Sequence, residues 1–362
     1  MGQVPEKPWI APRSLCILRL SALGDATHVL PVIRRIQSQL PECRLTWVIG
    51  KGESRLLEGL DGVEFVVYDK HGGRASLRDF RDRMRSRRYD VLLHMQLALR
   101  ANLLSSFIPA RRRIGYDRRR SKEGHGLFIN ERIAPDGHHV LDAFQQFLPP
   151  LGIAPGPVEW NLPVPPEAAD WARAQWPEEG HTLVISPCSS HPLRNWNVDG
   201  YAALASHAMA RGWRVVLSGG VSELERQVSD AIIARCDGPV VDLVGKDTLK
   251  QMIALLARAD LMAGPDAGPV HVANAVGTPV LGLYACTDAE RSGPYSDRRW
   301  TVNRYAEAAE RFMHRPAKEL RWGQRIERPG VMDLIRADDA IRRFDEFCAL
   351  RQWRAGGQAG GL

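Results

Sequence analysis

The 362-residue sequence lacks the features that mark several large classes of protein. It has no apolar run near the roughly 18–20 residues that span a bilayer. Its first eight residues carry an acid and two prolines, which is not the pattern of a signal peptide. No internal repeat indicates a solenoid. We therefore expect a cytoplasmic protein without a membrane-spanning segment.

The sequence also lacks paired-cysteine motifs and a phosphate-binding loop motif. The six cysteines are scattered, with no C-x-x-C pair and no spacing typical of a metal site. Most of them lie in apolar runs, so we interpret them as reduced, buried side chains. No segment matches G-x-x-x-x-G-K-[ST], which argues against a P-loop phosphotransferase.

What the sequence does contain is a regular alternation of short apolar runs and amphipathic stretches, interrupted by a proline-rich segment at 149–180. This pattern predicts two α/β domains with parallel sheets covered on both faces. Ligands of such sheets bind outside the carboxyl ends of the strands. The predicted parts are an extension at 1–13, a first domain at 14–160, a linker at 161–180, a second domain at 181–335, a C-terminal helix at 336–353 that packs back on the first domain, and a disordered tail at 354–362.

The charge is unevenly distributed. The formal net charge is +7, but residues 70–125 hold sixteen Lys/Arg against five Asp/Glu, so the rest of the chain is slightly acidic. This local excess indicates an anionic partner for the first domain. For residues 78–88, a solvated helix face explains the charges equally well.

The first candidate site follows the first predicted strand, where Gly24 and Asp25 stand at the start of a helix. An aspartate at this place commonly caps its helix. It also suits a general base, because the transfer of a group to a hydroxyl needs a residue that accepts the hydroxyl proton. A positioned carboxylate contributes roughly 10²–10⁴-fold to such a step. Spacing alone favours the capping interpretation.

Two loops of the second half carry groups that suit a nucleotide. Ser189 and Ser190, followed by Arg194, offer hydroxyls and a cation for phosphate oxygens. Glu223 follows a strand and a glycine pair, where an acid can accept hydrogen bonds from a ribose.

A third loop, at residues 264–275, combines small residues with a helix start, which lets a phosphate approach the backbone. The negative charge of Asp266 would repel a diphosphate. The residue fits this site better if it orders the loop or contacts a sugar hydroxyl. His271 lies in the first turn, where a lone histidine is usually structural.

Taken in this order, the loops resemble the heptosyltransferase family of lipopolysaccharide core assembly, glycosyltransferase family 9, over about residues 14–350. The most specific pieces are Ser21-x-x-Gly24-Asp25-x-x-His28-x-Leu30-Pro31 and Asp266-x-Gly268-Pro269-x-His271-x-Ala273-x-Ala275. Ala267 replaces a serine that is common in the family, and Arg194 replaces a frequent lysine.

The resemblance implies a GT-B fold, with two Rossmann-like domains facing across a cleft. It implies ADP-L-glycero-β-D-manno-heptose as donor and a Kdo or heptose residue of the inner core as acceptor. Transfer would invert the anomeric centre with Asp25 as base and without a cofactor or a tightly held metal. The implied donor-binding residues are Ser189, Ser190, Arg194, Glu223 (with Glu225 as a second register), Asp266, Gly268 and His271.

An acidic acceptor agrees with the basic first domain. Arginine binds carboxylates and phosphates bidentately. The same surface could hold the enzyme at the inner membrane, at about 1 kcal/mol per basic residue. The candidate acceptor contacts are Lys51, Arg55, Arg74, Arg100, Arg112, Arg113, Arg118, Arg119 and Arg120.

Two alternative functions stay open at the level of the sequence. One is a family-9 transferase that uses another nucleotide sugar. The other is a non-catalytic protein that binds an acidic glycan or nucleic acid through its basic region, which predicts salt-sensitive binding and no response to nucleotide.

Overall fold

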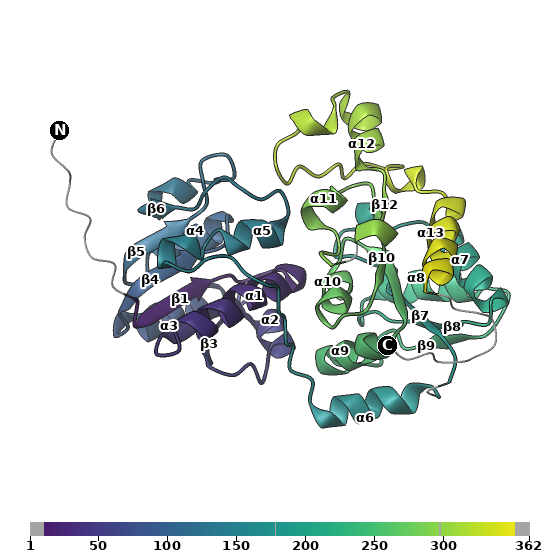
Figure 1. The fold of residues 1–362 in the computed structure, drawn as a ribbon, viewed down its shortest axis with the longest axis horizontal. Coiled ribbons are helices and arrows are strands. Elements are labelled where there is room, and N and C mark those ends of the chain that lie inside the picture. The colour runs from purple at the N-terminus through teal and green to yellow at the C-terminus, as the bar shows by residue number, and fades with distance from the viewer. Residues whose placement is uncertain (1–10, 178, 297, 352–362) are drawn as a thin grey trace. The chain divides into compact units, whose positions relative to one another are not determined.

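The computed structural model describes residues 11–177, 179–296 and 298–351. The chain forms two compact units, with the division between Trp160 and Asn161. Each unit is built on a six-stranded sheet whose strands all pair in parallel (Figure 1). The predicted α/β class is therefore confirmed. The predicted tail at 354–362 and residues 1–10 of the predicted extension lie outside the described residues.

The first unit has the strand order β3-β2-β1-β4-β5-β6. Its strands are β1 (Ser14–Leu18), β2 (Arg44–Gly50), β3 (Val63–Tyr68), β4 (Tyr89–His94), β5 (Ala110–Gly115) and β6 (Glu131–Arg132). Its helices are α1 (Leu23–Gln39), α2 (Lys51–Leu56), α3 (Gly73–Arg85), α4 (Leu99–Ser105) and α5 (Val140–Gln145), with the 3-10 turns η1 (His125–Leu127) and η2 (Pro149–Leu151).

The second unit has the order β12-β11-β10-β7-β8-β9. Its strands are β7 (Thr182–Ile185), β8 (Arg214–Leu217), β9 (Val240–Asp242), β10 (Leu261–Pro265), β11 (Val280–Tyr284) and β12 (Val302–Asn303). Its α-helices are α6 (Pro166–Gln175), α7 (Val198–Ala210), α8 (Glu223–Ile233), α9 (Leu249–Arg258), α10 (Gly268–Ala275), α11 (Ala289–Ser292), α12 (Tyr305–Ala308) and α13 (Ala337–Leu350). Short helical turns are η3 (Pro192–Arg194), η4 (Arg298–Trp300), η5 (Ala309–Met313), η6 (Ala317–Glu319) and η7 (Met332–Leu334).

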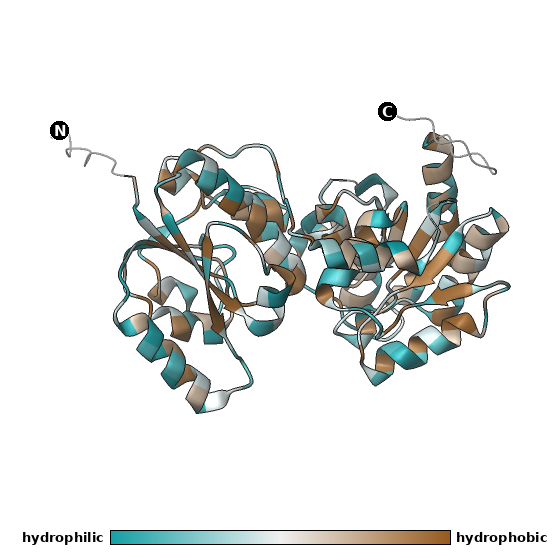
Figure 2. Cartoon of the chain, turned by 90° about the horizontal axis from the view of Figure 1, so that it is seen from below, coloured by the Kyte–Doolittle hydropathy of each residue, from teal (hydrophilic) through white to brown (hydrophobic). Residues whose placement is uncertain are grey.

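The apolar runs become central strands because helices cover both faces of each sheet. Leu15 and Ile17 of β1 are fully buried, as are Leu183 and Ile185 of β7. Figure 2 shows the hydrophobic colour concentrated along the strands, whereas the helices alternate between apolar and polar faces. The carboxyl ends of the strands are left to the loops, where the candidate residues lie.

The sequence did not predict β5, β6 or β12, and β5 was missed because half of its residues are arginines. β5 contains Arg111, Arg112 and Arg113, which do not read as a buried strand. The sheet accommodates Arg112 through a cross-strand pair, in which Nε and Nη2 donate to the two carboxylate oxygens of Glu131 at 2.7 Å each. Arg112, a candidate acceptor contact, is therefore engaged within the fold.

The segment predicted as linker contains a helix of the second unit. α6 begins at Pro166, and proline is tolerated at a first helical position because that N–H has no partner within the helix. Ala168 and Ala172 of α6 pack with Ala254 of α9. Pro165 and Pro166 therefore start a helix within the segment that we predicted as a linker.

The predicted C-terminal helix forms as α13, but its predicted packing on the first domain is wrong. Phe344 and Phe347 lie in the apolar core of the second unit, beside Trp213 and Trp300. The ring centroids of Trp300 and Phe347 are 5.1 Å apart in an edge-to-face contact. Its apolar stripe therefore completes the core of its own unit.

Candidate functional site

Both sheets reverse their strand order beside their first strand. β1 lies between β2 and β4, and β7 lies between β8 and β10. At such a switch point the loops of the two neighbouring strands diverge and leave room for a ligand. In the first unit, the backbone N–H of Leu20 donates to Oε1 of Gln96 at 2.7 Å and joins the loops that follow β1 and β4.

Asp25 lies at the switch point of the first unit, in the first turn of α1. Its Oδ2 accepts a hydrogen bond from the backbone N–H of Ala22 at 3.3 Å, so it caps its own helix as the spacing predicts. The same oxygen is ion-paired with the Arg19 guanidinium. The side chain keeps 29% of its surface exposed. Capping and a role towards a ligand are thus compatible.

Arg19 is a member of this site that the sequence analysis missed. It follows β1 directly and is only 12% exposed. Nη1 donates to the carbonyl of Met95 at 2.6 Å, and the guanidinium lies 5.4 Å from the ring centre of Phe144. An arginine at the end of a buried strand, just before the loop with Asp25, was the available signal.

A second carboxylate lies near this pair. Burial raises the pKa of Glu53 on α2, and the negative charge of Asp25 acts in the same direction. Its own backbone N–H and the charges of Lys70 and Arg19 partly oppose that shift. Glu53 is therefore a rival proton acceptor at the same edge of the sheet.

Several of the predicted acceptor contacts are exposed. Lys51 follows β2 directly, and its Nζ lies 3.8 Å from Oδ2 of Asp69, which follows β3. This pair lies at the same carboxyl edge as Asp25. The other exposed candidates are Arg55, Arg74, Arg100, Arg118 and Arg119.

Arg113 is not suited to bind an acceptor, which corrects that prediction. Nε donates to the carbonyl of Phe128 at 2.7 Å, Nη1 to that of Ile108 at 2.8 Å, and Nη2 to that of Ser105 at 2.7 Å. Burial lowers the pKa of this guanidinium. Arg113 holds together the segments on either side of β5.

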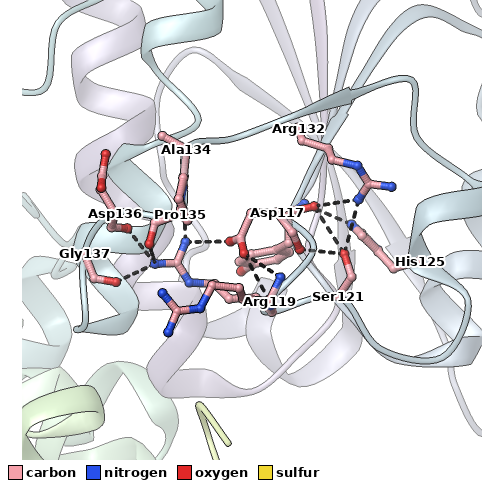
Figure 3. A network of polar contacts seen from close by, with 11 residues as sticks. Asp117, Arg119, Ser121, His125, Arg132, Ala134, Pro135, Asp136 and Gly137 are labelled. Atoms are coloured by element: carbon pink, nitrogen blue, oxygen red, sulfur yellow. Dashed lines mark hydrogen bonds and ion pairs between the residues drawn. The ribbon is translucent and has the colours of Figure 1, made fainter.

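Arg120 is also wrongly predicted as an acceptor contact. Its side chain is 4% exposed, and Nη1 pairs with Oδ2 of Asp117 at 2.9 Å. Its two terminal nitrogens also donate to four consecutive backbone carbonyls. These carbonyls, labelled in Figure 3, belong to Ala134, Pro135, Asp136 and Gly137. The guanidinium ties the loop after β5 to the loop before α5.

In the second unit, the loop after β7 is tightly folded around Ser189. Its N–H and hydroxyl both donate to Oδ1 of Asn195, at 2.7 and 3.0 Å. The hydroxyl also lies 2.9 Å from the carbonyl of His191. Ser190 accepts a bond of 3.4 Å from Nη2 of Arg194. Ser190 and Arg194 therefore face one another, whereas Ser189 chiefly shapes the loop; that these residues bind a phosphate stays a prediction.

Arg194 has a carboxylate partner that the sequence did not reveal. Its Nε lies 3.2 Å from Oε1 of Glu327, and the arginine side chain is 12% exposed. The segment that carries Glu327 is held in place because the N–H of Ile326 donates to the carbonyl of Cys286 at 2.8 Å. A contact between residues 133 positions apart leaves no signal in a single sequence.

The loop after β8 separates the two acids considered for a ribose. Glu225 accepts from the N–H of Gly220 at 2.7 Å and from the hydroxyl of Ser222 at 2.6 Å, which makes it part of a capping box. Glu223 is exposed and contacts Gln227 of its own helix at 3.0 Å. Glu223 therefore stays the candidate residue for contact with a ribose, and Glu225 orders the loop.

Asp266 and His271 form a pair at the start of α10. Nε2 of His271 lies 3.3 Å from Oδ1 of Asp266, and the hydroxyl of Ser292 donates to Oδ2 at 3.2 Å. Burial alone raises the pKa of Asp266, but the hydrogen bond and charge of His271, with Thr287 and Arg291, hold it below its usual value. The acid thus orders the loop, as one of the two predicted roles requires.

The backbone itself approaches closely at this switch point. A Cβ on Gly264 would lie 2.7 Å from the carbonyl oxygen of Ser186, so only glycine fits between β10 and the loop after β7. Gly268 begins α10, the next element after β10; in its first turn Pro269 has no N–H, and the N–H of Val270 donates to the carbonyl of Ala267 at 3.2 Å. Free N–H groups at a helix start favour an anion.

The sequence of the chain is similar to those of known glycosyltransferases. A sequence model of glycosyltransferase family 9 (heptosyltransferase) matches residues 77–322, which is more than half of the chain. The lipopolysaccharide core heptosyltransferase OpsX of Haemophilus influenzae is 36% identical over 338 residues, covering 93% of this chain and 97% of that protein. The chain belongs to glycosyltransferase family 9. It is therefore a glycosyltransferase, as predicted.

Solved structures of the family share the fold. The family-9 glycosyltransferase of Veillonella parvula has a TM-score of 0.76 at 18% identity, covering 93% of this chain and 97% of that chain. Escherichia coli heptosyltransferase WaaC with ADP has a TM-score of 0.70 at 18% identity, covering 92% and 99%. These neighbours have the GT-B fold, which confirms the predicted fold class.

Among residues 11–177, 179–296 and 298–351, no helix is both long and apolar enough to cross a membrane. No group of three or more His, Cys, Asp or Glu side chains among them is arranged to hold a metal ion. That transfer needs neither metal nor cofactor stays a prediction. The family match begins after Asp25, so the role of this residue rests on its geometry.

Proposed function

We propose that this enzyme moves a heptose from ADP-L-glycero-β-D-manno-heptose to a Kdo or heptose residue of the lipopolysaccharide inner core. The relative from Haemophilus influenzae carries the proposal, because it is a lipopolysaccharide core heptosyltransferase with 36% identity over nearly the whole chain. The Escherichia coli structures with ADP and with ADP-2-deoxy-2-fluoro heptose support an ADP-linked donor.

The proposed reaction is a single displacement. The acceptor hydroxyl oxygen attacks the anomeric carbon while the bond from that carbon to the β-phosphate oxygen breaks, and its electron pair leaves with ADP. Attack from the opposite face inverts the anomeric centre. Asp25 accepts the hydroxyl proton, a role supported by its place at the switch point and its partly exposed carboxylate.

The second unit would bind the donor and stabilise the leaving group. Arg194 brings a positive charge next to Ser190, and charge placed in advance stabilises a diphosphate as it leaves. The N-terminal end of α10 and the close backbone approach at Gly264 offer further contacts to phosphate oxygens. Glu223 would contact the ribose. No metal ion takes part in the proposed step.

This function also predicts a location. The donor is a water-soluble nucleotide sugar and the acceptor is anchored in lipid, so the reaction would take place in the cytoplasm at the inner-membrane face.

A donor panel tests the function. The purified enzyme is incubated with truncated lipopolysaccharide and with ADP-, GDP- or UDP-linked sugars. The mass of the acceptor is then measured by mass spectrometry. We expect the mass of one heptose to be added with the ADP-heptose only. Transfer from a GDP- or UDP-sugar instead would refute the donor, and no transfer with any donor would refute the function.

A further inference from the structure

Three leucines of the first unit expose much of their apolar surface. The exposed fractions are 51% for Leu99 and 52% for Leu103 on α4, and 88% for Leu127 on η1. Leu99 and Leu103 are four residues apart and so lie on one face of the helix. Ala101 and Leu104 on its other face are buried. The helix therefore turns apolar side chains both to the core and to solvent.

The two elements that carry these leucines are joined by hydrogen bonds. The backbone N–H of Leu99 donates to the carboxylate of Glu123, and Nδ2 of Asn102 donates to the carbonyl of Glu123 at 2.9 Å. Nδ1 of His125 lies 3.0 Å from Oδ1 of Asn102. These contacts hold the segment that leads into η1 beside α4, so the three exposed leucines lie on adjoining elements of the unit.

Exposed cations accompany the leucines. Arg100 lies between the leucines of α4, and Arg118 and Arg119 lie in the loop that leads to η1. Between residues 99 and 132 the chain carries nine Lys/Arg against three Asp/Glu. The carboxylate of Glu123 accepts a hydrogen bond from the N–H of Leu99 at the start of α4, which partly offsets the negative charge that it adds to this basic region. We call Leu99, Leu103, Leu127, Arg100, Arg118 and Arg119 the leucine–arginine patch.

We propose that the leucine–arginine patch docks on the surface of an anionic lipid bilayer. Aliphatic side chains enter the boundary between headgroups and acyl chains, while arginines bind lipid phosphates, and the two effects together give stable attachment. The exposed apolar residues are leucines, which offer no aromatic platform for nucleic-acid bases. The combination therefore fits a lipid surface better than a nucleic acid.

The place of the patch suits the acceptor. α4 follows β4, and the loop with Arg118 and Arg119 follows β5, so the patch begins at the carboxyl edge that also carries Asp25. Docking would hold this edge close to a lipid-anchored sugar. This last step rests on the proposed function, whereas lipid binding itself can be measured without it.

The test is sedimentation of the full-length protein with vesicles. Vesicles of phosphatidylethanolamine with phosphatidylglycerol are compared with vesicles of phosphatidylcholine alone. We expect binding to the anionic vesicles that weakens with salt. The variant Leu99→Ser/Leu103→Ser/Leu127→Ser should bind at least about tenfold more weakly. Arg118→Ser/Arg119→Ser should lose binding to a similar extent.

Matched controls come from elsewhere in the chain. Leu350→Ser removes a leucine that is 67% exposed on α13, and Arg78→Ser/Arg85→Ser removes two exposed charges from α3. Both should bind vesicles almost like the wild type. Equal losses of vesicle binding in the controls, or wild-type binding by the leucine variant, would overturn the proposal. It would also be overturned if the wild type bound no vesicles and the leucine substitutions changed its oligomeric state.

Activity separates this inference from the proposed function. The leucine variant should keep normal transfer to a lipid-free acceptor oligosaccharide and lose rate on acceptor embedded in vesicles. If the protein binds vesicles but transfers no heptose, the result would support lipid binding by the leucine–arginine patch and refute the proposed function. Normal rates of the leucine variant on vesicle-embedded acceptor would refute docking as a part of catalysis.

Discussion

The guanidinium of Arg19 is ion-paired with the carboxylate of Asp25, and both residues lie at the end of the central strand of the first unit. The pair and the N–H of Ala22 fix the orientation of the carboxylate while part of it stays exposed. A base that is already oriented loses little conformational entropy when the hydroxyl group of the acceptor sugar binds.

Asp25→Asn should lower the turnover number by about 10²-fold or more, because an amide cannot accept the proton. Thermal stabilisation by ADP should be unchanged, because the proposed donor residues belong to the other unit. Glu53→Gln is the matched control, since it removes the neighbouring carboxylate. A larger loss of turnover in Glu53→Gln than in Asp25→Asn would transfer the role of base to Glu53.

Arg194→Ala should weaken ADP binding by roughly 10–100-fold, the range for loss of a hydrogen bond to a charged group. Arg325→Ala is the control, because Arg325 also contacts Glu327, at 3.8 Å, but its side chain is 54% exposed. Isothermal titration with ADP measures both variants. Equal affinities of wild type and Arg194→Ala would remove this arginine from the donor site.

Glu327 fixes Arg194, and the sequence could not have predicted this. The local pattern was sufficient for the apolar strands β1 to β4 and β7 to β11 and for the loops that follow them, because apolar runs and glycine–acid turns are signals within a few residues. The pair of Arg194 and Glu327 joins segments far apart in the chain. Only the fold brings such residues together.

The arginines of the first unit illustrate the same limit. Arg118 and Arg120 are two positions apart and identical in the sequence, yet one is exposed and the other is 4% exposed beneath five oxygen acceptors. Charge alone predicts an anionic partner for both. The buried role depends on carbonyls of residues 134–137, which no periodicity reveals.

Arg120→Ala should therefore destabilise the first unit by about 3–5 kcal/mol, because Asp117 would keep a buried charge without its partner. Arg118→Ala, an exposed neighbour, should change the free energy of unfolding by less than about 0.5 kcal/mol. Urea unfolding followed by circular dichroism compares the two. A stable Arg120→Ala variant would mean that the network in Figure 3 contributes little to the fold.

Two histidines of the first unit are buried against one another. The rings of His94 and His125 are 4.5 Å apart, and Nε2 of His125 accepts from the N–H of Tyr116 at 3.1 Å, which requires the neutral ring. Burial, with the charge of Arg132, lowers the pKa of His125 to about 4. Burial, followed by the charge of His125, lowers that of His94 well below its usual value.

A histidine whose pKa is lower in the folded state takes up its proton on unfolding. The stability from these rings is therefore complete above the unfolded pKa of about 6.5 and is lost as the pH falls towards 4. For His125 the loss is on the order of 3 kcal/mol. His94→Phe keeps an aromatic ring and cannot be protonated, so its free energy of unfolding should fall less steeply over this range. Identical slopes for variant and wild type would show that His94 does not set the acid sensitivity.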